Sequence, residues 1–523
     1  MHASSETVTS VARVLALSVP LLLGCTKRGD PPGSGLDAGK RQVAIESSVR
    51  AGLTALDAGA ARSLVTRGTT DDNLPFSPSG LRGASTAWRT WIYTDVGPRR
   101  TRFGYLRVGS IVDLRGPPIV NEGCAEGWYR INPRGFICIG KGATLDLETP
   151  IVRQASVRPV RGAGLPYLYA LASDSPPHFY FELPTRKQAA RVEGADPLGR
   201  FLRWRGREVD SHPEVAELLG TPGPPPDFLA NHGRIDKPYG VKHRLEYAMH
   251  AGRAAADSGF AISRVMAWDE RWFGMTTEHD LIALDRVHIV VPSRFHGIEV
   301  PPDPGLQPGF VTAPATVRFA LDPKTSAYLP RGALSRREPV LLTGQRRPGG
   351  MWELRDGDWV AASALLIIPS RSDYPSFATG NRKWIELSIR HQTLVAYVGR
   401  RPVYATLVST GRGGLGDPET ESATPRGTFM IYAKHVTATM DGADDVADSY
   451  SLLDVPFVQY FHKGFALHGT YWHDEFGRLR SHGCVNLAPV DAAWLFEWTD
   501  PQVPAHWHGV LNKQRGTVVY IHA

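Results

Sequence analysis

The C-terminal part of the chain alternates apolar and polar residues in short runs, which is the pattern of half-buried β-strands. Three such runs follow one another at Lys383–Ile389, Thr393–Tyr397 and Arg401–Thr406, with polar turns between them. Pro489–Trp498 has the composition of a helix instead, and Gly516–Ile521 again has the pattern of a strand. These patterns predict an antiparallel β sandwich that carries one helix.

Two smaller β patterns precede this region. Gly104–Leu114 alternates apolar and polar residues, and short strands are predicted at Gly127–Ile131 and Gly135–Cys138. This arrangement resembles a bacterial SH3-like barrel, whose aromatic residues we expect in the core rather than on a ligand platform. Glu338–Ile368 has short apolar runs separated by Gly-rich turns, and it resembles a second small barrel.

The middle of the chain gives a weaker pattern. Thr185–Glu193 and Tyr247–Asp257 have helical composition, and the run Thr221–Pro226 breaks the chain between them. Leu281–Val291 and Pro314–Leu321 have the pattern of strands. The sequence predicts a mixed α+β region here and assigns it no function.

Composition narrows the class of protein. A chain of 523 residues is too long for a single core, so we expect several domains. Its 53 glycines and 41 prolines favour loop-rich β domains over helical bundles. The net charge of +7 suits an anionic wall polymer or lipid headgroups. The sequence contains no nucleic-acid motif, so nucleic acid is not an expected partner.

The first residues have the pattern of an export signal. Val11–Leu23 is apolar but too short to span a bilayer permanently, and it leads to Gly24 and Cys25. This ending resembles a bacterial lipobox, which implies a lipoprotein signal peptide at residues 1–25 with lipid attached to Cys25. A plain signal peptide and a buried helix are the alternatives. A lipid anchor places the protein in the cell envelope, on the periplasmic side and at the outer membrane.

Cys484 is the centre of the candidate chemistry. It lies in the segment Ser481–Asn486, which reads SHGCVN, and His468 precedes that segment across a loop. A free cysteine has a pKa of about 8.5, so it needs a nearby base to form a thiolate near neutral pH. A Cys and a His brought together by a turn supply nucleophile and base for acyl transfer. Gly483 would let the backbone turn so that adjacent N–H groups face a developing oxyanion.

Further segments carry a family resemblance. His468 begins the triplet HGT, Ala423–Phe429 reads ATPRGTF, and Val408–Gly411 reads VSTG. Together with SHGCVN, they resemble the active-site signature of the L,D-transpeptidases, the YkuD-type catalytic domain. The resemblance covers residues 380–523. It implies a β sandwich and a cysteine-based acyltransferase that needs neither a metal nor another cofactor.

The resemblance also implies a role for each site residue. Cys484 is the expected nucleophile and His468 the general base and then acid, with the Gly469 carbonyl orienting the imidazole. The backbone amides of Gly483 and Cys484 are expected to form the oxyanion hole. The expected substrate-binding residues are Tyr460, Arg480, His482 and Asn486; His482 could instead have a structural role, and Asn486 is also expected to tie the loop by side-chain hydrogen bonds. For the first two of these, a core or surface role fits the sequence equally well.

The implied substrates are the stem peptides of peptidoglycan. Cys484 attacks the carbonyl at the L-centre of meso-diaminopimelate in a tetrapeptide and expels D-Ala. The side-chain amine of diaminopimelate in a second stem then takes the acyl group from the thioester, which gives a 3→3 cross-link. Water as the acceptor gives L,D-carboxypeptidase activity, and a lipoprotein lysine gives protein attachment.

Two alternatives to a cysteine-based acyltransferase remain open. One is a metal cluster, although the spacing of its residues matches no familiar zinc motif. Its members would be His462, His468, His473, His482 and Cys484. The other is a wall-binding lipoprotein in which the barrels do the work and the catalytic domain is degenerate.

The fold class expected from these patterns is mainly β, with a C-terminal YkuD-like β sandwich, SH3-like β-barrel accessory domains and a mixed α+β middle region. Cys124 and Cys138 flank one hairpin-like segment, and in an oxidising compartment we expect a disulfide rather than two buried thiols. The expected segments are a signal peptide at 1–25, a flexible tether at 26–88, an SH3-like domain at 89–150, the middle region at 151–335, a small β segment at 336–372 and the catalytic domain at 380–523.

Overall fold

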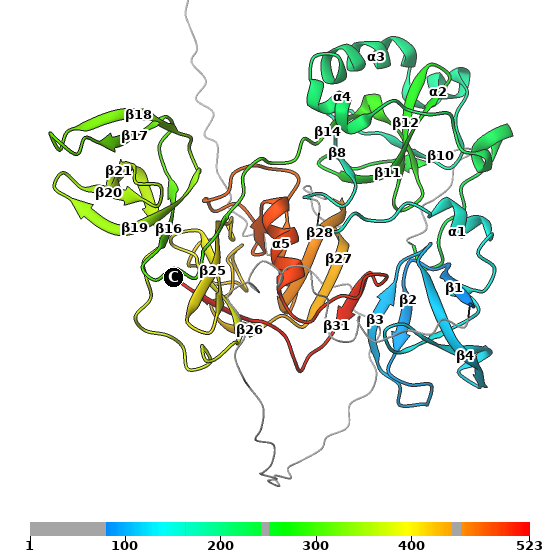
Figure 1. Ribbon diagram of the computed structural model, residues 1–523. Helices are drawn as coiled ribbons and strands as arrows, with labels where there is room; N and C mark the ends of the chain where they lie inside the picture. Colours follow the sequence, from blue (N-terminus) through cyan, green and yellow to red (C-terminus); the bar gives the residue numbers. More distant parts are fainter. Residues whose placement is uncertain (1–79, 163, 242–249, 442–450) are drawn as a thin grey trace, which may run out of the picture.

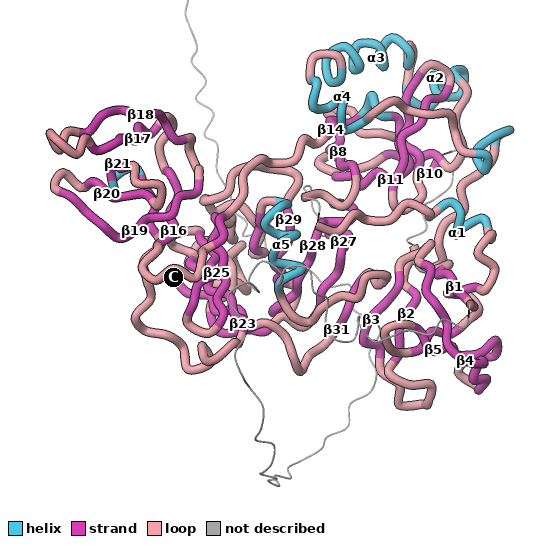
Figure 2. The backbone as a smooth tube through the Cα atoms, viewed as in Figure 1, coloured by secondary structure: helices cyan, strands magenta, loops and turns pink. Residues whose placement is uncertain are grey.

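The computed structural model describes residues 80–162, 164–241, 250–441 and 451–523 (Figure 1). The expected signal peptide, Cys25 and most of the expected tether lie outside these residues. The fold is mainly β, with 42% of the described residues in strands and 13% in helices, and most of the helices gather in one part of the molecule (Figure 2). Among the described residues, none of the helices has the length and apolar character that crossing a membrane requires.

The N-terminal unit comprises seven strands. They are β1 (Arg82–Ser85), β2 (Thr90–Tyr93), β3 (Arg102–Leu106), β4 (Ile111–Asn121), β5 (Cys124–Ile131), β6 (Phe136–Cys138) and β7 (Ala143–Thr144). The pairings run β7–β1–β4–β5–β6–β2–β3, and within the described residues this series does not close into a barrel. The SH3-like barrel expected here is therefore not confirmed.

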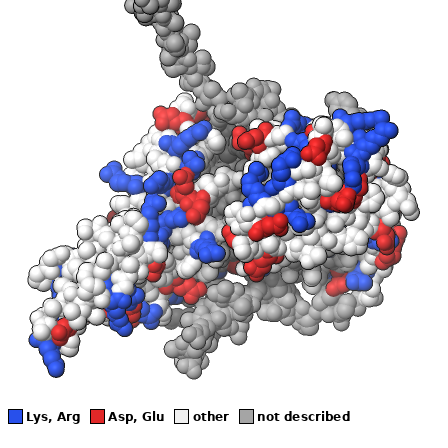
Figure 3. All heavy atoms as spheres, turned by 90° about the horizontal axis from the view of Figure 1, so that it is seen from above, with Lys and Arg blue, Asp and Glu red and all other residues white. Residues whose placement is uncertain are grey.

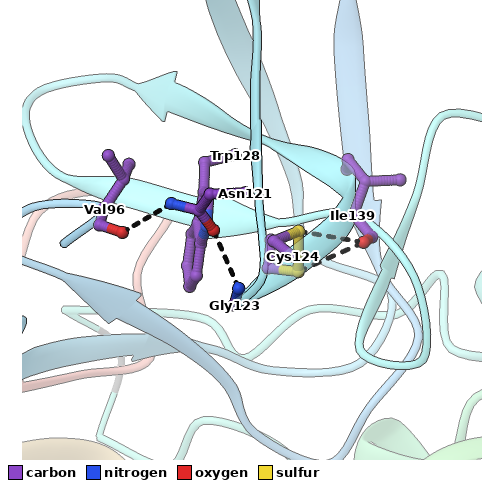
Figure 4. The surroundings of a disulfide bond; sticks show 7 residues. Val96, Asn121, Gly123, Cys124, Trp128 and Ile139 are labelled. Carbon is purple, nitrogen blue, oxygen red and sulfur yellow. Dashed lines mark hydrogen bonds between the residues drawn. A yellow bond between two sulfur atoms is a disulfide. The ribbon is translucent and has the colours of Figure 1, made fainter. Parts of the chain in front are cut away.

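A disulfide joins Cys124 and Cys138 in this unit (Figure 4). Beside it, the side chain of Asn121 ties the β4–β5 hairpin. Its Nδ2 donates to the Val96 carbonyl at 2.8 Å, and its Oδ1 accepts from the Trp128 indole N–H at 2.9 Å. Trp128 is buried, which agrees with the core role expected for the aromatic residues of this segment.

The middle unit is a β sheet covered by helices. Its strands are β8 (Leu168–Ala172), β9 (His178–Tyr180), β10 (His250–Arg253), β11 (Gly259–Trp268), β12 (Arg271–Thr276), β13 (Leu281–Ala283) and β14 (Val287–Ile289). Its helices are α2 (Arg186–Glu193), α3 (Pro197–Trp204) and α4 (Pro213–Leu219), and α1 (Pro150–Gln154) connects it to the N-terminal unit. Thr185 and Gln188 form a capping box that starts α2.

Two predictions for the middle unit were wrong. The helix predicted at Tyr247–Asp257 is, over its described residues, strand β10 followed by a turn, because His250 pairs with Tyr180 of β9. The single strand predicted at Leu281–Val291 is two strands, β13 and β14, separated by a 3₁₀ turn at Leu284–Arg286. In both cases pairing with a strand that is distant in the sequence decided the secondary structure, and a local sequence pattern carries no information about such a partner.

The third unit is a separate seven-stranded sheet. Its strands are β16 (Gln307–Val311), β17 (Thr316–Leu321), β18 (Tyr328–Leu334), β19 (Pro339–Arg347), β20 (Met351–Leu354), β21 (Trp359–Ala361) and β22 (Leu365–Ile367). The sheet begins upstream of residue 336, where the sequence placed its start. Its order is β18–β17–β21–β20–β19–β16–β22, so the described strands form an open series and the second SH3-like barrel is not confirmed.

The C-terminal unit contains two sheets and helix α5 (Pro489–Trp498). One sheet has the order β15–β25–β24–β23–β32–β26, from strands Ile298–Glu299, Arg401–Leu407, Thr393–Val398, Lys383–Ser388, Val518–His522 and Gly427–Met430. The other contains β27 (Ala433–Asp441), β28 (Ser451–His462), β29 (Phe465–Gly469), β30 (Val485–Leu487) and β31 (Gly509–Leu511). Helix α5 packs against β28 and β29 (Figure 2).

The sandwich is not purely antiparallel, so that prediction was wrong. Strand β23 pairs in parallel with β32, and β29 pairs in parallel with β30. Parallel neighbours need a long connection, and the β29–β30 connection is the loop between His468 and Cys484. The second sheet also continues into the N-terminal and middle units, because β3 pairs with β31 and β11 meets β28.

Candidate active site

The turn that carries Cys484 depends on Gly483. Gly483 has a φ of 124°, a region that other residues rarely adopt. A Cβ there would also lie 2.5 Å from Cε1 of Phe465, so the turn has no room for a side chain. The carbonyl of Gly483 accepts a hydrogen bond from Thr424 Oγ1 at 2.8 Å, and Thr424 Oγ1 accepts one from the Gly411 amide at 2.9 Å. The ATPRGTF and VSTG segments therefore support the cysteine turn directly.

Ser481 closes the same turn from within. Its hydroxyl donates to the Cys484 carbonyl and accepts from the Gly483 amide at 3.0 Å. The Gly483 N–H, expected to serve an oxyanion, is thus already engaged in this state. Its role in the oxyanion hole stays a prediction and would require this bond to yield.

The strand register puts Cys484 and His468 on one face of the sheet. Leu467 pairs with Val485 and His468 with Asn486, and successive side chains of a strand alternate between faces. Leu467 and Val485 lie in the hydrophobic cluster between the two sheets. Cys484, which precedes Val485, belongs instead to the cluster on the opposite face. By the same alternation His468 faces that side, diagonally across from Cys484.

The imidazole of His468 is held in one tautomer. Its Nδ1 donates to the Gly469 carbonyl at 3.0 Å, which leaves Nε2 with the lone pair. Burial is the main cause that lowers the pKa of His468 to about 4; the Gly469 carbonyl opposes this shift and the nearby His473 adds to it. The ring is therefore neutral near pH 7, the form in which Nε2 can accept a proton from a thiol.

His473 is a half-buried neighbour, for which the sequence suggested only the metal alternative. Burial lowers its pKa to about 4. Its Nδ1 accepts from the Glu475 amide at 3.2 Å, which leaves the proton on Nε2, and Nε2 lies 2.9 Å from the side-chain amide of Asn486. Asn486, predicted to bind substrate, thus fastens the β29–β30 loop to β30. Among the described residues, no three His, Cys, Asp or Glu side chains are grouped as metal ligands would be.

The other predicted substrate contacts lie around this loop. Arg480 is half-exposed and pairs with Glu475 at 2.5 Å. Tyr460 is half-buried on β28 and packs against the cluster that contains Cys484. His482 is half-buried next to the turn. Contact of these three residues with substrate stays a prediction.

Strand β28, next to β29, is anchored by a buried carboxylate. Asp454 accepts from both Nη atoms of Arg107, at 3.0 and 2.8 Å, and from Thr437 Oγ1 at 2.7 Å. Burial alone would raise the pKa of Asp454, but the Arg107 guanidinium lowers it to about 2. Because Arg107 belongs to the N-terminal unit, the support of the site extends beyond the C-terminal unit.

The charges on the surface are mixed. Figure 3 looks down on the molecule from above, and on this face Lys and Arg alternate with Asp and Glu among the described residues. The face therefore has no single-sign field of the kind that steers a polyanion.

Comparison with known proteins finds relatives for residues 382–521. They match the family model described as the L,D-transpeptidase catalytic domain, YkuD. L,D-transpeptidase 1 of Mycobacterium tuberculosis is 28% identical over 156 residues, which are 27% of this chain and 61% of that protein. The chain thus spans less than two thirds of the mycobacterial relative. The putative L,D-transpeptidase YciB of Bacillus subtilis is 24% identical over 155 residues, which are 28% of this chain and 72% of that protein.

Among solved structures, the catalytic domain of an Enterococcus faecium L,D-transpeptidase is 23% identical and covers 27% of this chain and 98% of its own. Its TM-score of 0.21 is too low to add support. The family model and the curated relatives carry the identification. They support an L,D-transpeptidase catalytic domain of the YkuD type at residues 382–521.

Proposed function

We propose that this protein is a peptidoglycan L,D-transpeptidase in which Cys484 is the nucleophile and His468 the base. The observation that supports the proposal most is the β29–β30 register, in which His468 pairs with Asn486, together with the position of Cys484 in the hydrophobic cluster on the face toward which His468 points. The bond from His468 Nδ1 to the Gly469 carbonyl supports it, because that bond presents a neutral Nε2. The identity of the donor and acceptor stems rests on the family resemblance.

The first half-reaction forms a thioester. His468 Nε2 takes the thiol proton, and the sulfur of Cys484 bonds to the carbonyl carbon at the L-centre of diaminopimelate in the donor tetrapeptide. The resulting imidazolium gives its proton to the departing amine as the bond to D-Ala breaks. Both side chains are buried, with 2% and 4% of their surface exposed, so little water surrounds the reacting groups.

The second half-reaction releases the enzyme. The side-chain amine of another stem attacks the thioester carbonyl, loses its proton to His468, and expels the Cys484 thiolate, which is then reprotonated. The product is a 3→3 cross-link. The Cys484 amide is the first candidate for the oxyanion hole, because the Gly483 amide is bonded to Ser481 at rest.

The proposed setting is the cell envelope. A lipid on Cys25 would anchor the protein on the periplasmic side, and the residues after it would let the folded units reach the wall. The disulfide between Cys124 and Cys138 suits an oxidising compartment.

The test is incubation of the protein with disaccharide-tetrapeptide, followed by mass spectrometry of the products. Wild type should release D-Ala and form 3→3 dimers, and Cys484→Ala should do neither. His468→Gln, which keeps a side chain of similar size, should lower the rate by about 10²–10⁴-fold. Tripeptide without dimers would indicate a carboxypeptidase. Unchanged substrate, with the Cys484 thiol intact, would overturn the proposal in favour of a wall-binding protein.

A further inference from the structure

Two tyrosines connect the middle unit to the loop that follows His468. Tyr169 lies on β8 of the middle unit, and Tyr471 lies three residues after His468. Their ring centroids are 4.3 Å apart with 34° between the planes, and both side chains are buried. A close aromatic pair of this kind adds about 0.5–1.5 kcal/mol to the burial itself.

Both hydroxyls reach the same strand. Tyr169 donates to the Asp454 carbonyl at 2.6 Å, and Tyr471 donates to the Leu453 carbonyl at 3.3 Å. The pair is thus held at consecutive residues of β28. Gly259 on β11 leaves the space for Tyr471, because a Cβ at Gly259 would lie 2.2 Å from the Tyr471 hydroxyl oxygen. The middle unit is therefore shaped around this loop residue.

The contact continues from Tyr471 to the base. The rings of Tyr471 and Trp472 meet edge to face with centroids 5.1 Å apart. Trp472 in turn lies over His468, with centroids 5.7 Å apart and 34° between the planes. Three aromatic side chains thus form a continuous path from β8 to the imidazole. Trp472 is half-buried, whereas His468 is buried, so the path ends on a ring that is partly exposed to solvent.

We propose that Tyr169 is a positioning residue for acyl transfer. This inference rests on the proposed function. In it, Tyr169 fixes Tyr471 and so keeps Trp472 packed over His468. This packing orients the imidazole toward Cys484 and limits the access of water to the thioester. The middle unit is then part of the catalytic apparatus, and its integrity sets the ratio of transfer to hydrolysis.

The test uses full-length protein in detergent and compares three variants. Tyr169→Leu removes the ring, and Tyr169→Phe keeps the ring but loses the hydroxyl. Tyr180→Phe is the matched control, because Tyr180 is equally buried in the same unit but donates to Glu193 within it, at 2.9 Å. Thermal unfolding shows which variants are folded. The first readout is the pH profile of Cys484 alkylation by iodoacetamide. The second is the reaction with disaccharide-tetrapeptide, from which kcat, KM and the dimer-to-tripeptide ratio are measured.

Tyr169→Leu should lower kcat by about 10–100-fold with little change in KM, because small misplacements of reacting groups have effects of this size. It should also shift products toward tripeptide and alter the alkylation profile. Tyr169→Phe should recover most of the rate, and Tyr180→Phe should match wild type. If Tyr169→Leu does not fold, Gly259→Ala takes its place, since it displaces Tyr471 from the other side.

Wild-type kcat, product ratio and alkylation profile in a folded Tyr169→Leu or Gly259→Ala protein would overturn the inference. Equal losses in Tyr169→Phe and Tyr180→Phe would overturn it too, since they would reflect stability alone. If wild type forms no product, the proposed function fails separately. The alkylation profile, which needs no wall substrate, then still decides whether Tyr169 positions the base.

Discussion

The middle and third units are attached to the C-terminal unit in different ways. The middle unit shares a hydrophobic cluster with β28 and the cysteine turn, and its backbone meets β28 at the pair Gly259 and Leu452. Within the part of the chain that the structure describes, the strands of the third unit pair only among themselves, around their own core. Its attachment is through side chains, including Phe310 against Phe295 and the ion pair Arg337–Asp474.

This difference in attachment predicts which unit can affect catalysis. A unit joined by backbone pairing and buried hydroxyls transmits a change in its own packing to the site. A unit joined by a few side chains can shift with less consequence, as contacts between domains commonly allow. We therefore expect damage in the middle unit to reach Cys484 and comparable damage in the third unit to stay local.

The largest expected effect comes from replacing a buried aspartate by asparagine, once on β28, against which the middle unit packs, and once in the third unit. Asp454→Asn leaves Arg107 buried without its charge partner, which typically costs about 3–5 kcal/mol. Asp358→Asn in the third unit removes a carboxylate that is as deeply buried, and that accepts from Arg318 and Arg331. Urea unfolding should show a loss for both variants. Cys484 alkylation and dimer formation should fall only with Asp454→Asn, and equal loss of reactivity in both would contradict the comparison.

Counted per residue, an intermediate effect is expected from acid. Burial lowers the pKa of His279 and His468 to about 4 and of His435 to about 3, from about 6.5 in the unfolded chain. At a pH between the folded and the unfolded pKa values, the folded state thus binds fewer protons than the unfolded chain. The stability contributed is fully present above pH 6.5 and is lost as the pH falls toward 4, by about 2 kcal/mol per histidine at pH 5.

The third unit, residues 307–367, contains no histidine. Hydrogen exchange at pH 7 and pH 5, corrected for intrinsic rates, should therefore show loss of protection in the middle and C-terminal units first. The third unit serves as the internal control. If its protection falls in parallel with the others, the buried histidines are not the cause of the acid sensitivity.

The smallest effect is expected at the exposed attachment of the third unit. Arg337 Nη2 lies 2.7 Å from Oδ2 of Asp474, whose side chain is 53% exposed. Exposed ion pairs of this kind contribute about 0–1 kcal/mol. Arg337→Gln should leave the urea midpoint and the rate of dimer formation close to wild type. A drop in rate of tenfold or more would show that the third unit is coupled to the loop that follows His468.

Local signals in the sequence predicted local structure well. Helix α5 begins and ends where its composition indicated, at Pro489 and Trp498. The helix predicted from composition at Thr185–Glu193 is α2, and β23–β25 follow the three alternating runs. These features depend on residues a few positions apart, which is why they can be read from the chain.

Non-local pairing was not readable in the same way. The residues at 250–253 have helical composition, yet they form β10 because β9 lies beside them. Alternating runs gave the strands of the sandwich but not the parallel pairs β23–β32 and β29–β30. Tyr169 carries no local mark of its contact with Tyr471, because these residues are far apart in the chain and meet only in the fold.

The sequence by itself determined the chemistry that is available, a cysteine in SHGCVN with a histidine and a glycine carbonyl upstream. It also determined the tight turn, because only glycine fits at position 483. The tertiary structure decided which groups meet. Parallel pairing set His468 and Cys484 on one face, burial set the pKa of His468, and docking of the middle unit set the loop beside it. Register and burial are properties of neighbours that the chain brings together only on folding.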